Sequence, residues 1–268
     1  MDVREIMTAD PVTASVDASL DELMRTMDEH DVRHLPIVDG GEVVGVLSDR
    51  DLYGVTGWLP QGAQQEGAPG SARDLVGRSP VHCSPDDSVV MVAVDLTSRL
   101  IGCLPVIEEG VLAGIVTEMD LLGAYVDVSQ LENSSEQLHD PVSKHMSSNV
   151  STLPSTASLA EALELSSSRH VRHLPIVDGD QMVGIVSDRD LRKALGRGLA
   201  TETQLAEVMS REPMTLAPDE TLSQAAARLL EHKFSALPVV QDGHLVGILT
   251  LIDLLEHCIV NLRNPDSR

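Results

Sequence analysis

Apolar residues recur along the chain in one order, four times over. Each copy opens with a stripe at the helical spacing of 0, 3, 4 and 7, although the third copy has a serine at the last position. This spacing places one apolar face on an amphipathic helix. A serine or threonine before each stripe is a good helix cap, and three copies complete a capping box three residues later. The capping pairs are Ser19 with Glu22, Ser158 with Glu161, and Thr221 with Gln224; in the second copy Ser88 precedes the stripe.

Two short apolar runs follow each predicted helix. In the first copy they are residues 35–38 and 43–47, separated by Asp39-Gly40-Gly41-Glu42, a pattern typical of strand, tight turn and strand. A short extended segment precedes the first helix, and a second helix begins at a hydroxyl residue after the second strand. Each copy is therefore predicted as helix–strand–strand–helix, and the fold class as α+β.

The copies align without a gap on a proline in the first strand. Glycine, Ser or Thr, and Asp stand nine, twelve and fifteen residues after each proline, and coincidence is not a serious rival explanation. The prolines are Pro36, Pro105, Pro175 and Pro238. The glycines are Gly45, Gly114, Gly184 and Gly247. Met7, Met146 and Met209 align upstream, with Val76 in the second copy, and are interpreted as packing residues.

One copy has too little apolar surface to bury itself, so neighbouring copies are expected to pair with their sheets back to back. We place repeats 1 to 4 at residues 1–58, 72–128, 139–198 and 204–262. The Gly/Gln/Pro-rich residues 59–71 and the polar residues 129–139 are interpreted as linkers. Two paired modules result, module 1 at residues 1–128 and module 2 at residues 139–262.

Charge narrows the range of functions. The 268 residues carry 42 acidic and 19 basic side chains, a net charge of −23, with only four aromatic residues. Such a chain repels nucleic-acid phosphates and anionic membranes, so we expect neither as a partner. No apolar run approaches the ~18 residues of a membrane span. Three sparse cysteines and a start without a signal-like apolar stretch favour a cytoplasmic location.

The repeat unit resembles the CBS domain, named for cystathionine β-synthase. The resemblance rests on the Leu-Pro-[Ile/Val] strand, the Val-x-Gly-[Ile/Val] strand and the Ser/Thr-x-x-Asp segment that opens the last helix, and it covers nearly the whole chain. It implies tandem pairs called Bateman modules, which often pack as a disc. It also implies binding of adenosine-containing ligands in clefts between paired repeats, and no catalytic residue.

The Ser/Thr-x-x-Asp segments are the ribose candidates that the resemblance implies. One ionised carboxylate offers two acceptor oxygens to the vicinal hydroxyls of a ribose. The same segment is also a helix cap with an acidic third residue, and for any single copy this structural role has about equal weight. The pairs are Ser48 with Asp51, Thr117 with Asp120, Ser187 with Asp190, and Thr250 with Asp253.

Two copies carry a basic pair just before the proline, Arg33-His34 and Arg172-His173. By resemblance these side chains meet ligand phosphates, for which arginine offers a planar fork of donors. The alternative is a surface ion pair with Asp31 or Asp178. Arg50 and Arg189, inside Ser-Asp-Arg-Asp, are further phosphate candidates. Repeats 2 and 4 have Gly102-Cys103 and Ser235-Ala236 instead, so we expect two stronger sites, one in each module.

The remaining candidates are residues of the adenine cleft, two pairs of histidines and one cysteine. The resemblance places Thr13, Thr152, Ile37 and Ile176 at the adenine cleft. His30 and His34, or His170 and His173, have metal-ligand spacing, but no carboxylate or cysteine pattern joins them and no metal site is predicted. Cys103 is interpreted as a small core residue. No phosphate-binding P-loop and no nucleophile elbow are present.

The sequence thus predicts a sensor of AMP, ADP or ATP that is not an enzyme and requires no cofactor. The output is expected to be an unknown effector protein or a change in self-association, with the chain either a homodimer or a monomeric disc of four repeats. Three alternatives stay open: a scaffold for protein interactions that binds no ligand, an enzyme whose reactive residues form no visible constellation, and a sensor of S-adenosylmethionine, NAD or a guanine nucleotide.

Overall fold

The structure is a computed structural model that describes residues 1–56, 69–77, 80–131 and 137–263. The chain divides into two compact units, Met1–Leu121 and Leu122–Arg268. Most of the first predicted linker, residues 59–71, lies outside the described residues. The second, residues 129–139, is partly helical, because the helix before it continues to Leu131 and a 3-10 turn covers Gln137–His139.

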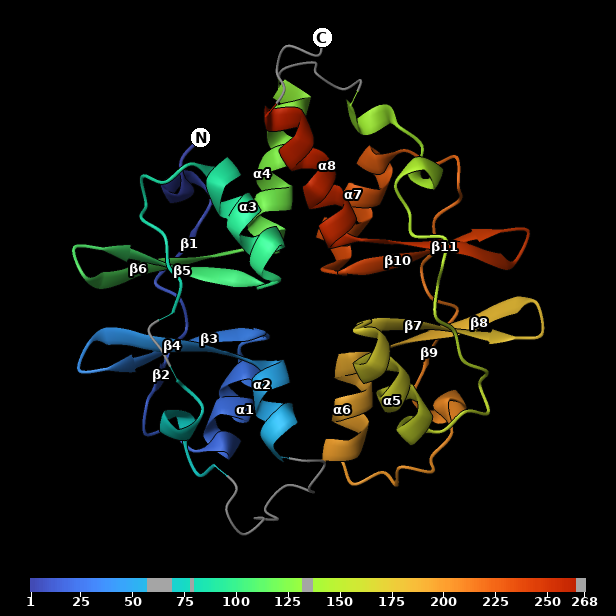
Figure 1. Cartoon of the computed structure of the whole chain (residues 1–268), viewed down its shortest axis with the longest axis horizontal. Coiled ribbons are helices and arrows are strands. Elements are labelled where there is room, and N and C mark those ends of the chain that lie inside the picture. Colours follow the sequence, from blue (N-terminus) through green and yellow to red (C-terminus); the bar gives the residue numbers. More distant parts are fainter. Residues whose placement is uncertain (57–68, 78–79, 132–136, 264–268) are drawn as a thin grey trace. The chain divides into compact units, whose positions relative to one another are not determined.

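All four copies fold as helix–strand–strand–helix, which confirms the α+β prediction (Figure 1). Repeat 1 contains β1 Thr8–Ala9, β2 Ala14–Ser15, α1 Leu20–Glu29, β3 His34–Asp39, β4 Glu42–Ser48 and α2 Asp49–Thr56. Repeat 2 contains α3 Val89–Arg99, β5 Cys103–Glu108, β6 Val111–Thr117 and α4 Glu118–Leu131. Repeat 3 contains α5 Leu159–Arg169, β7 His173–Asp178, β8 Gln181–Ser187 and α6 Asp188–Gly196. Repeat 4 contains β9 Ser210–Arg211, α7 Leu222–His232, β10 Ala236–Gln241, β11 His244–Thr250 and α8 Leu251–Arg263. Short 3-10 turns lie at η1 Val3–Glu5, η2 Ala72–Asp74, η4 Val142–Lys144 and η5 Leu205–Glu207.

Capping decides where the first helix of each repeat begins. Ser19, Ser158 and Thr221 each accept a hydrogen bond from the backbone N–H three residues on, and a Glu or Gln side chain returns to the cap, as predicted. Ser88 makes no such side-chain bond. Met91 stands where the other copies have Glu or Gln, so α3 lacks a capping box.

The strand hairpins share one register in every repeat. The residue after each proline pairs with the glycine that aligns between the repeats, as in Ile37 with Gly45 and Ile176 with Gly184, and a bulge follows each time. The buried residues are mainly aliphatic and join the hairpin to its helices, as Leu23, Leu35 and Leu52 do in repeat 1. The described helices include none that is long and apolar enough to cross a membrane.

Neighbouring repeats exchange short strands. β1 of repeat 1 pairs antiparallel with β6 of repeat 2, and β9 of repeat 4 pairs with β8 of repeat 3. Ser147 of repeat 3 likewise bridges Ile248 of repeat 4. Within each module the two hairpins lie against one another, with their helices on the far sides (Figure 1). The predicted back-to-back pairing is therefore observed, with an exchange of strands that was not predicted.

The aligned methionines cover glycines of the partner repeat. Met7 lies over Gly114, Met146 over Gly247, and Met209 over Gly184, while Val76 covers Gly45. A Cβ on Gly184 would lie only 2.6 Å from Met209 Sδ and 3.0 Å from the carbonyl oxygen of Ser210. At Gly114, Gly184 and Gly247 a glycine is required because the partner's side chain and backbone both approach closely, and at Gly45 because the Val76 side chain does. The packing role predicted for the methionines is confirmed.

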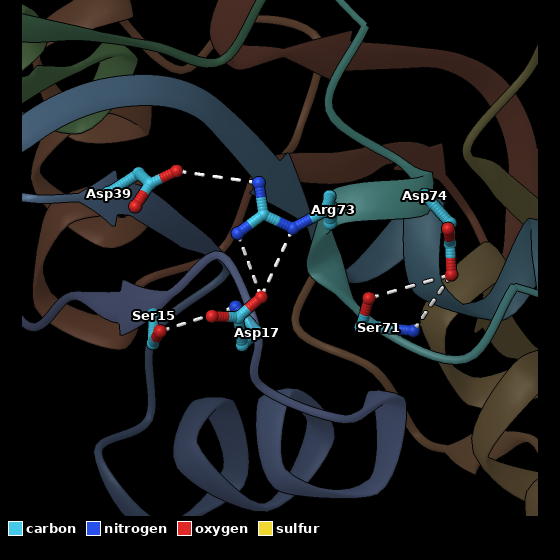
Figure 2. A network of polar contacts seen from close by, with 6 residues as sticks. All are labelled: Ser15, Asp17, Asp39, Ser71, Arg73 and Asp74. Atoms are coloured by element: carbon cyan, nitrogen blue, oxygen red, sulfur yellow. Dashed lines mark hydrogen bonds and ion pairs between the residues drawn. The ribbon is translucent and has the colours of Figure 1, made fainter.

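Two ion-pair networks join repeats 1 and 2 reciprocally. Arg73 of repeat 2 contacts Asp17 at 2.8 Å and Asp39 at 3.4 Å in repeat 1 (Figure 2). Arg4 of repeat 1 contacts Asp86 at 3.2 Å and Glu108 at 2.7 Å, the equivalent positions of repeat 2. Module 2 has Ser143 and Ala206 in place of the two arginines, so only module 1 has these networks.

Candidate functional site

The Ser/Thr-x-x-Asp segment has the same geometry in all four repeats. In each, Oδ2 of the aspartate accepts hydrogen bonds from the hydroxyl and from the backbone N–H of its Ser or Thr, at 2.6–2.9 Å. The hydroxyl in turn accepts a bond from the aspartate N–H at 3.2–3.4 Å. The role of helix cap, which the sequence also allowed for this segment, is thus present in every copy.

Capping leaves the second carboxylate oxygen available. Oδ1 of Asp51, Asp120, Asp190 and Asp253 makes no hydrogen bond or ion pair with the residues that the structure describes. An ionised carboxylate has acceptor capacity on both oxygens. Capping and binding of a ribose are therefore compatible at one aspartate, because Oδ2 is held by the chain and Oδ1 keeps its capacity to accept a hydrogen bond.

Repeat 2 holds its carboxylate in a less favourable environment. Burial raises the pKa of Asp120, while the hydrogen bonds from Thr117 oppose the rise. Burial also raises the pKa of the neighbouring Cys103 thiol to about 12, so that Cys103 is an inert core residue, as predicted. Because Gly102-Cys103 replaces the basic pair in this repeat, neither residue places a cation there to stabilise the Asp120 charge.

Strand register brings the ribose and phosphate candidates together. His34 on β3 lies directly opposite Ser48 on β4, and His173 on β7 lies opposite Ser187 on β8. The backbone carbonyl of Arg172 accepts a hydrogen bond from the N–H of Asp188 at 2.9 Å, as does that of Arg33 from Asp49 at 3.0 Å. The basic pair and the Ser-x-x-Asp segment therefore lie at the same end of one hairpin.

The histidines of the basic pairs also contact the partner repeat, which the sequence did not predict. His173 Nε2 lies 3.1 Å from Ser235 Oγ in repeat 4. A Cβ on Gly102 of repeat 2 would lie 2.7 Å from Cε1 and Nε2 of His34. Ser235 and Gly102 are equivalent positions, three residues before their prolines. This alignment of Ser235 with Gly102 was the only feature of the sequence that could have indicated the contact between the histidine and the partner repeat.

The arginines are placed differently. Arg33 is exposed and Arg172 half-buried. Neither guanidinium makes a hydrogen bond or ion pair with a described residue. The alternative ion pair between Arg172 and Asp178 does not form, because Asp178 accepts hydrogen bonds from Ser155 at 2.6 and 2.8 Å, which lower its pKa. Arg50 and Arg189 lie in the first turns of α2 and α6.

The adenine-cleft candidates fall into two environments. Thr13 and Thr152 are exposed, each one residue before the position that pairs in parallel with Ile37 or Ile176. Ile37 and Ile176 are fully buried in the core. The threonines thus lie on the surface beside a buried isoleucine.

Besides the Ser187–Asp190 cap, an ion pair stabilises the first turn of α6. Arg192 contacts Asp188 at 3.3 Å with both side chains largely buried. Its i, i+4 spacing was a usable sequence signal. Among the described residues, no group of three or more His, Cys, Asp and Glu could hold a metal ion.

Comparison with known proteins identifies the repeat. The model of the CBS domain family matches residues 3–55, 72–127, 142–197 and 205–259. An uncharacterised protein of Thermofilum pendens is 27% identical over 87% of this chain and 83% of its own. Protein MJ1225 of Methanocaldococcus jannaschii is 30% identical over 57% of this chain, and that match spans 59% of the relative's length.

Solved structures extend the match over almost the whole chain. The crystal structure of MJ1225, described as that of a proposed archaeal homologue of γ-AMPK, has a TM-score of 0.80 at 19% identity and covers 96% of this chain and 99% of its own. A conserved protein of Pyrococcus horikoshii has a TM-score of 0.67 at 23% identity, covering 96% of this chain and 100% of its own. Homoserine O-acetyltransferase of Methanohalophilus mahii matches at 39% identity, over only 23% of its length.

Proposed function

Because the chain belongs to the CBS domain family, we propose that it is a regulatory protein that binds an adenosine-containing nucleotide, AMP, ADP or ATP, and catalyses no reaction. The observation that carries this proposal is the cross-strand position of His34 opposite Ser48 and of His173 opposite Ser187. It brings the proposed phosphate-binding pair and the proposed ribose-binding segment to the same end of one hairpin.

Each part of the ligand has a matching group. Oδ1 of Asp51 or Asp190 accepts from the ribose hydroxyls, while Oδ2 stays bonded to its serine. Arg33 or Arg172, with the adjacent histidine, binds the phosphates. Thr13 and Thr152 contact the base. Ile37 and Ile176 support it from within the core.

The two modules each have one stronger site. A chain of net charge −23 repels phosphate overall, so affinity depends on local cations. Only repeats 1 and 3 carry the basic pair, and repeat 2 holds Asp120 with a raised pKa. Binding shifts the protein towards the conformation that holds the ligand better, by an amount set by the difference in affinity.

Thermal unfolding with a ligand panel tests the proposal. The panel contains AMP, ADP, ATP, GTP, NAD and S-adenosylmethionine. A ligand at about 100 times its dissociation constant stabilises one site by about 2.7 kcal/mol, which raises the unfolding midpoint on the order of 5–10 °C. The test variant is Asp51→Asn/Asp190→Asn, because asparagine keeps an acceptor for the serine N–H but loses the charge.

The matched control is Asp120→Asn/Asp253→Asn, in the repeats without a basic pair. We expect the test variant to unfold near the wild-type midpoint without ligand and to lose the ligand shift, while the control keeps it. Equal loss in both variants would contradict the two-site proposal. No shift with any ligand in a well-folded protein would favour a scaffold that binds proteins alone.

A further inference from the structure

The position three residues before each aligned proline distinguishes the two modules. Repeats 1 and 3 have an arginine there, whereas repeat 2 has Gly102 and repeat 4 has Ser235. The backbone at the last two is placed alike. The Gly102 carbonyl accepts a hydrogen bond from Glu118 N–H at 3.2 Å, and that of Ser235 accepts one from Leu251 N–H at 3.0 Å. Module 2 therefore has a hydroxyl where module 1 has no side chain.

The His173 imidazole, which this hydroxyl contacts, lies on the same face of its hairpin as the ribose candidate. His173 pairs with Ser187 across β7 and β8, and the side chains of paired residues in an antiparallel ladder project from one face. Leu174, the next residue of β7, projects to the opposite face and is buried in the core with Leu159 of α5. The contact between His173 and Ser235 is therefore on the side of the hairpin that carries Ser187.

The ribose candidates of the two repeats in a module both lie near this position. In module 1, burial raises the pKa of the Cys103 thiol most, and three carboxylates add to the rise: those of Glu118, Asp120 and Asp51. Asp120 belongs to the same repeat as Cys103, but Asp51 belongs to repeat 1. Both candidates thus act on the residue next to Gly102. Because Ser235 aligns with Gly102, its hydroxyl has the equivalent place in module 2.

We propose that Ser235 is a specificity-determining residue of the module 2 site, where its hydroxyl binds a phosphate oxygen of the nucleotide beside His173. A hydroxyl has one donor and two acceptor lone pairs. When Nε2 of His173 carries a proton, Oγ accepts a hydrogen bond from it at 3.1 Å, and the O–H donates to the phosphate. Gly102 offers no such donor, so module 2 binds the nucleotide more tightly than module 1. The inference rests on the proposed function.

Isothermal titration calorimetry with AMP and ATP tests the inference, and adenosine is the probe without a phosphate. All substitutions are made in the full chain carrying Asp51→Asn, so that the titration reports on the module 2 site. The test variant, Ser235→Ala, removes the hydroxyl, whereas Ser235→Thr keeps one. The matched control is Ser168→Ala, which removes a hydroxyl of the same module that is bonded only to its own helix.

We expect Ser235→Ala to bind AMP and ATP about tenfold more weakly than its Asp51→Asn parent, and to bind adenosine as well as the parent does. Ser235→Thr should restore the nucleotide affinity, and Ser168→Ala should leave it unchanged. The Asp51→Asn protein should also bind the nucleotides about tenfold more tightly than Asp190→Asn, in which the module 1 site remains.

Three results would overturn the inference. An equal loss of affinity for adenosine and for the nucleotides would mean that Ser235 only supports the fold. Unchanged nucleotide affinity in Ser235→Ala, or equal affinities of the Asp51→Asn and Asp190→Asn proteins, would contradict the inference while leaving the proposed function intact. If the wild type bound none of the probes, the proposed function would fail and the inference with it.

Discussion

His173 Nε2 lies 3.1 Å from the hydroxyl Oγ of Ser235, so the basic pair of repeat 3 is hydrogen-bonded to repeat 4 of the same module. The equivalent contact in module 1 has no hydroxyl, because His34 lies against Gly102. The two predicted sites are built alike but are joined differently to the neighbouring repeat.

Ser235→Ala should weaken the link between repeats 3 and 4. A buried or half-buried hydrogen bond contributes about 0.5–1.5 kcal/mol to the free energy of unfolding, and chemical denaturation measures that loss. The control is Ser168→Ala, which removes a hydroxyl bonded only to its own helix at 3.3 Å. An equal effect of the two substitutions would contradict a special role for Ser235.

Gly184→Ala should destabilise module 2 by about 1–3 kcal/mol, because the new Cβ collides with Met209 Sδ and with the Ser210 carbonyl oxygen. The backbone of β9 cannot withdraw without breaking its pairing with β8. Gly77→Ala is the control, since no atom lies within 4 Å of its added Cβ. Similar denaturation curves for both variants would show that the close approach relaxes easily.

Asp140 should make the free energy of unfolding depend on pH. Hydrogen bonds from Lys144 and His145 lower the pKa of Asp140, so folding favours its charged form. That contribution is complete above the unfolded value of about 3.9 and is lost as the pH falls through the lower folded value.

Urea denaturation of the wild type and Asp140→Asn between about pH 5 and pH 2 measures this effect. The stability advantage of the wild type should shrink as the pH falls. An advantage that stays constant over the whole range would mean that the carboxylate has the same pKa in the folded and unfolded states.

Arg73→Gln should destabilise module 1 in a way that salt removes. The Arg73 network is exposed, so its Coulomb energy is screened within about 10 Å at 0.1 M salt and within about 3 Å at 1 M. The unfolding midpoint of the variant should therefore be lower than that of the wild type in dilute buffer and equal to it near 1 M salt. A difference that persists in high salt would indicate lost packing.

Local features were predictable from the sequence, whereas contacts between repeats were not. The capping boxes and hairpins follow from residues a few positions apart, and the absence of a box at Ser88 follows from Met91. The alignment of Met7 with Met209 indicated packing. It could not say that each covers a glycine of the partner repeat, because that depends on the exchange of β1 and β9.

The candidate site divides in the same way. The motif placed Ser187 beside Asp190, and the hairpin register carried His173 to the same end of the sheet. Periodicity alone gives no distance across a module, so the contact of His173 with Ser235 had no strong signal. Burial of Ile37 and Ile176 depends on packing of the helices over the sheet, which the motif does not report.

The exchange of β1 has a consequence for synthesis of the chain. Thr8 pairs with Ile115, so β1 leaves the ribosome before its partner strand and has no partner until most of repeat 2 has been translated. Met7 waits for Gly114 in the same way. The nascent chain therefore cannot complete repeat 1 before repeat 2. The pair of repeats is the smallest part of the chain that can be released, duplicated or transplanted with all its strand pairings.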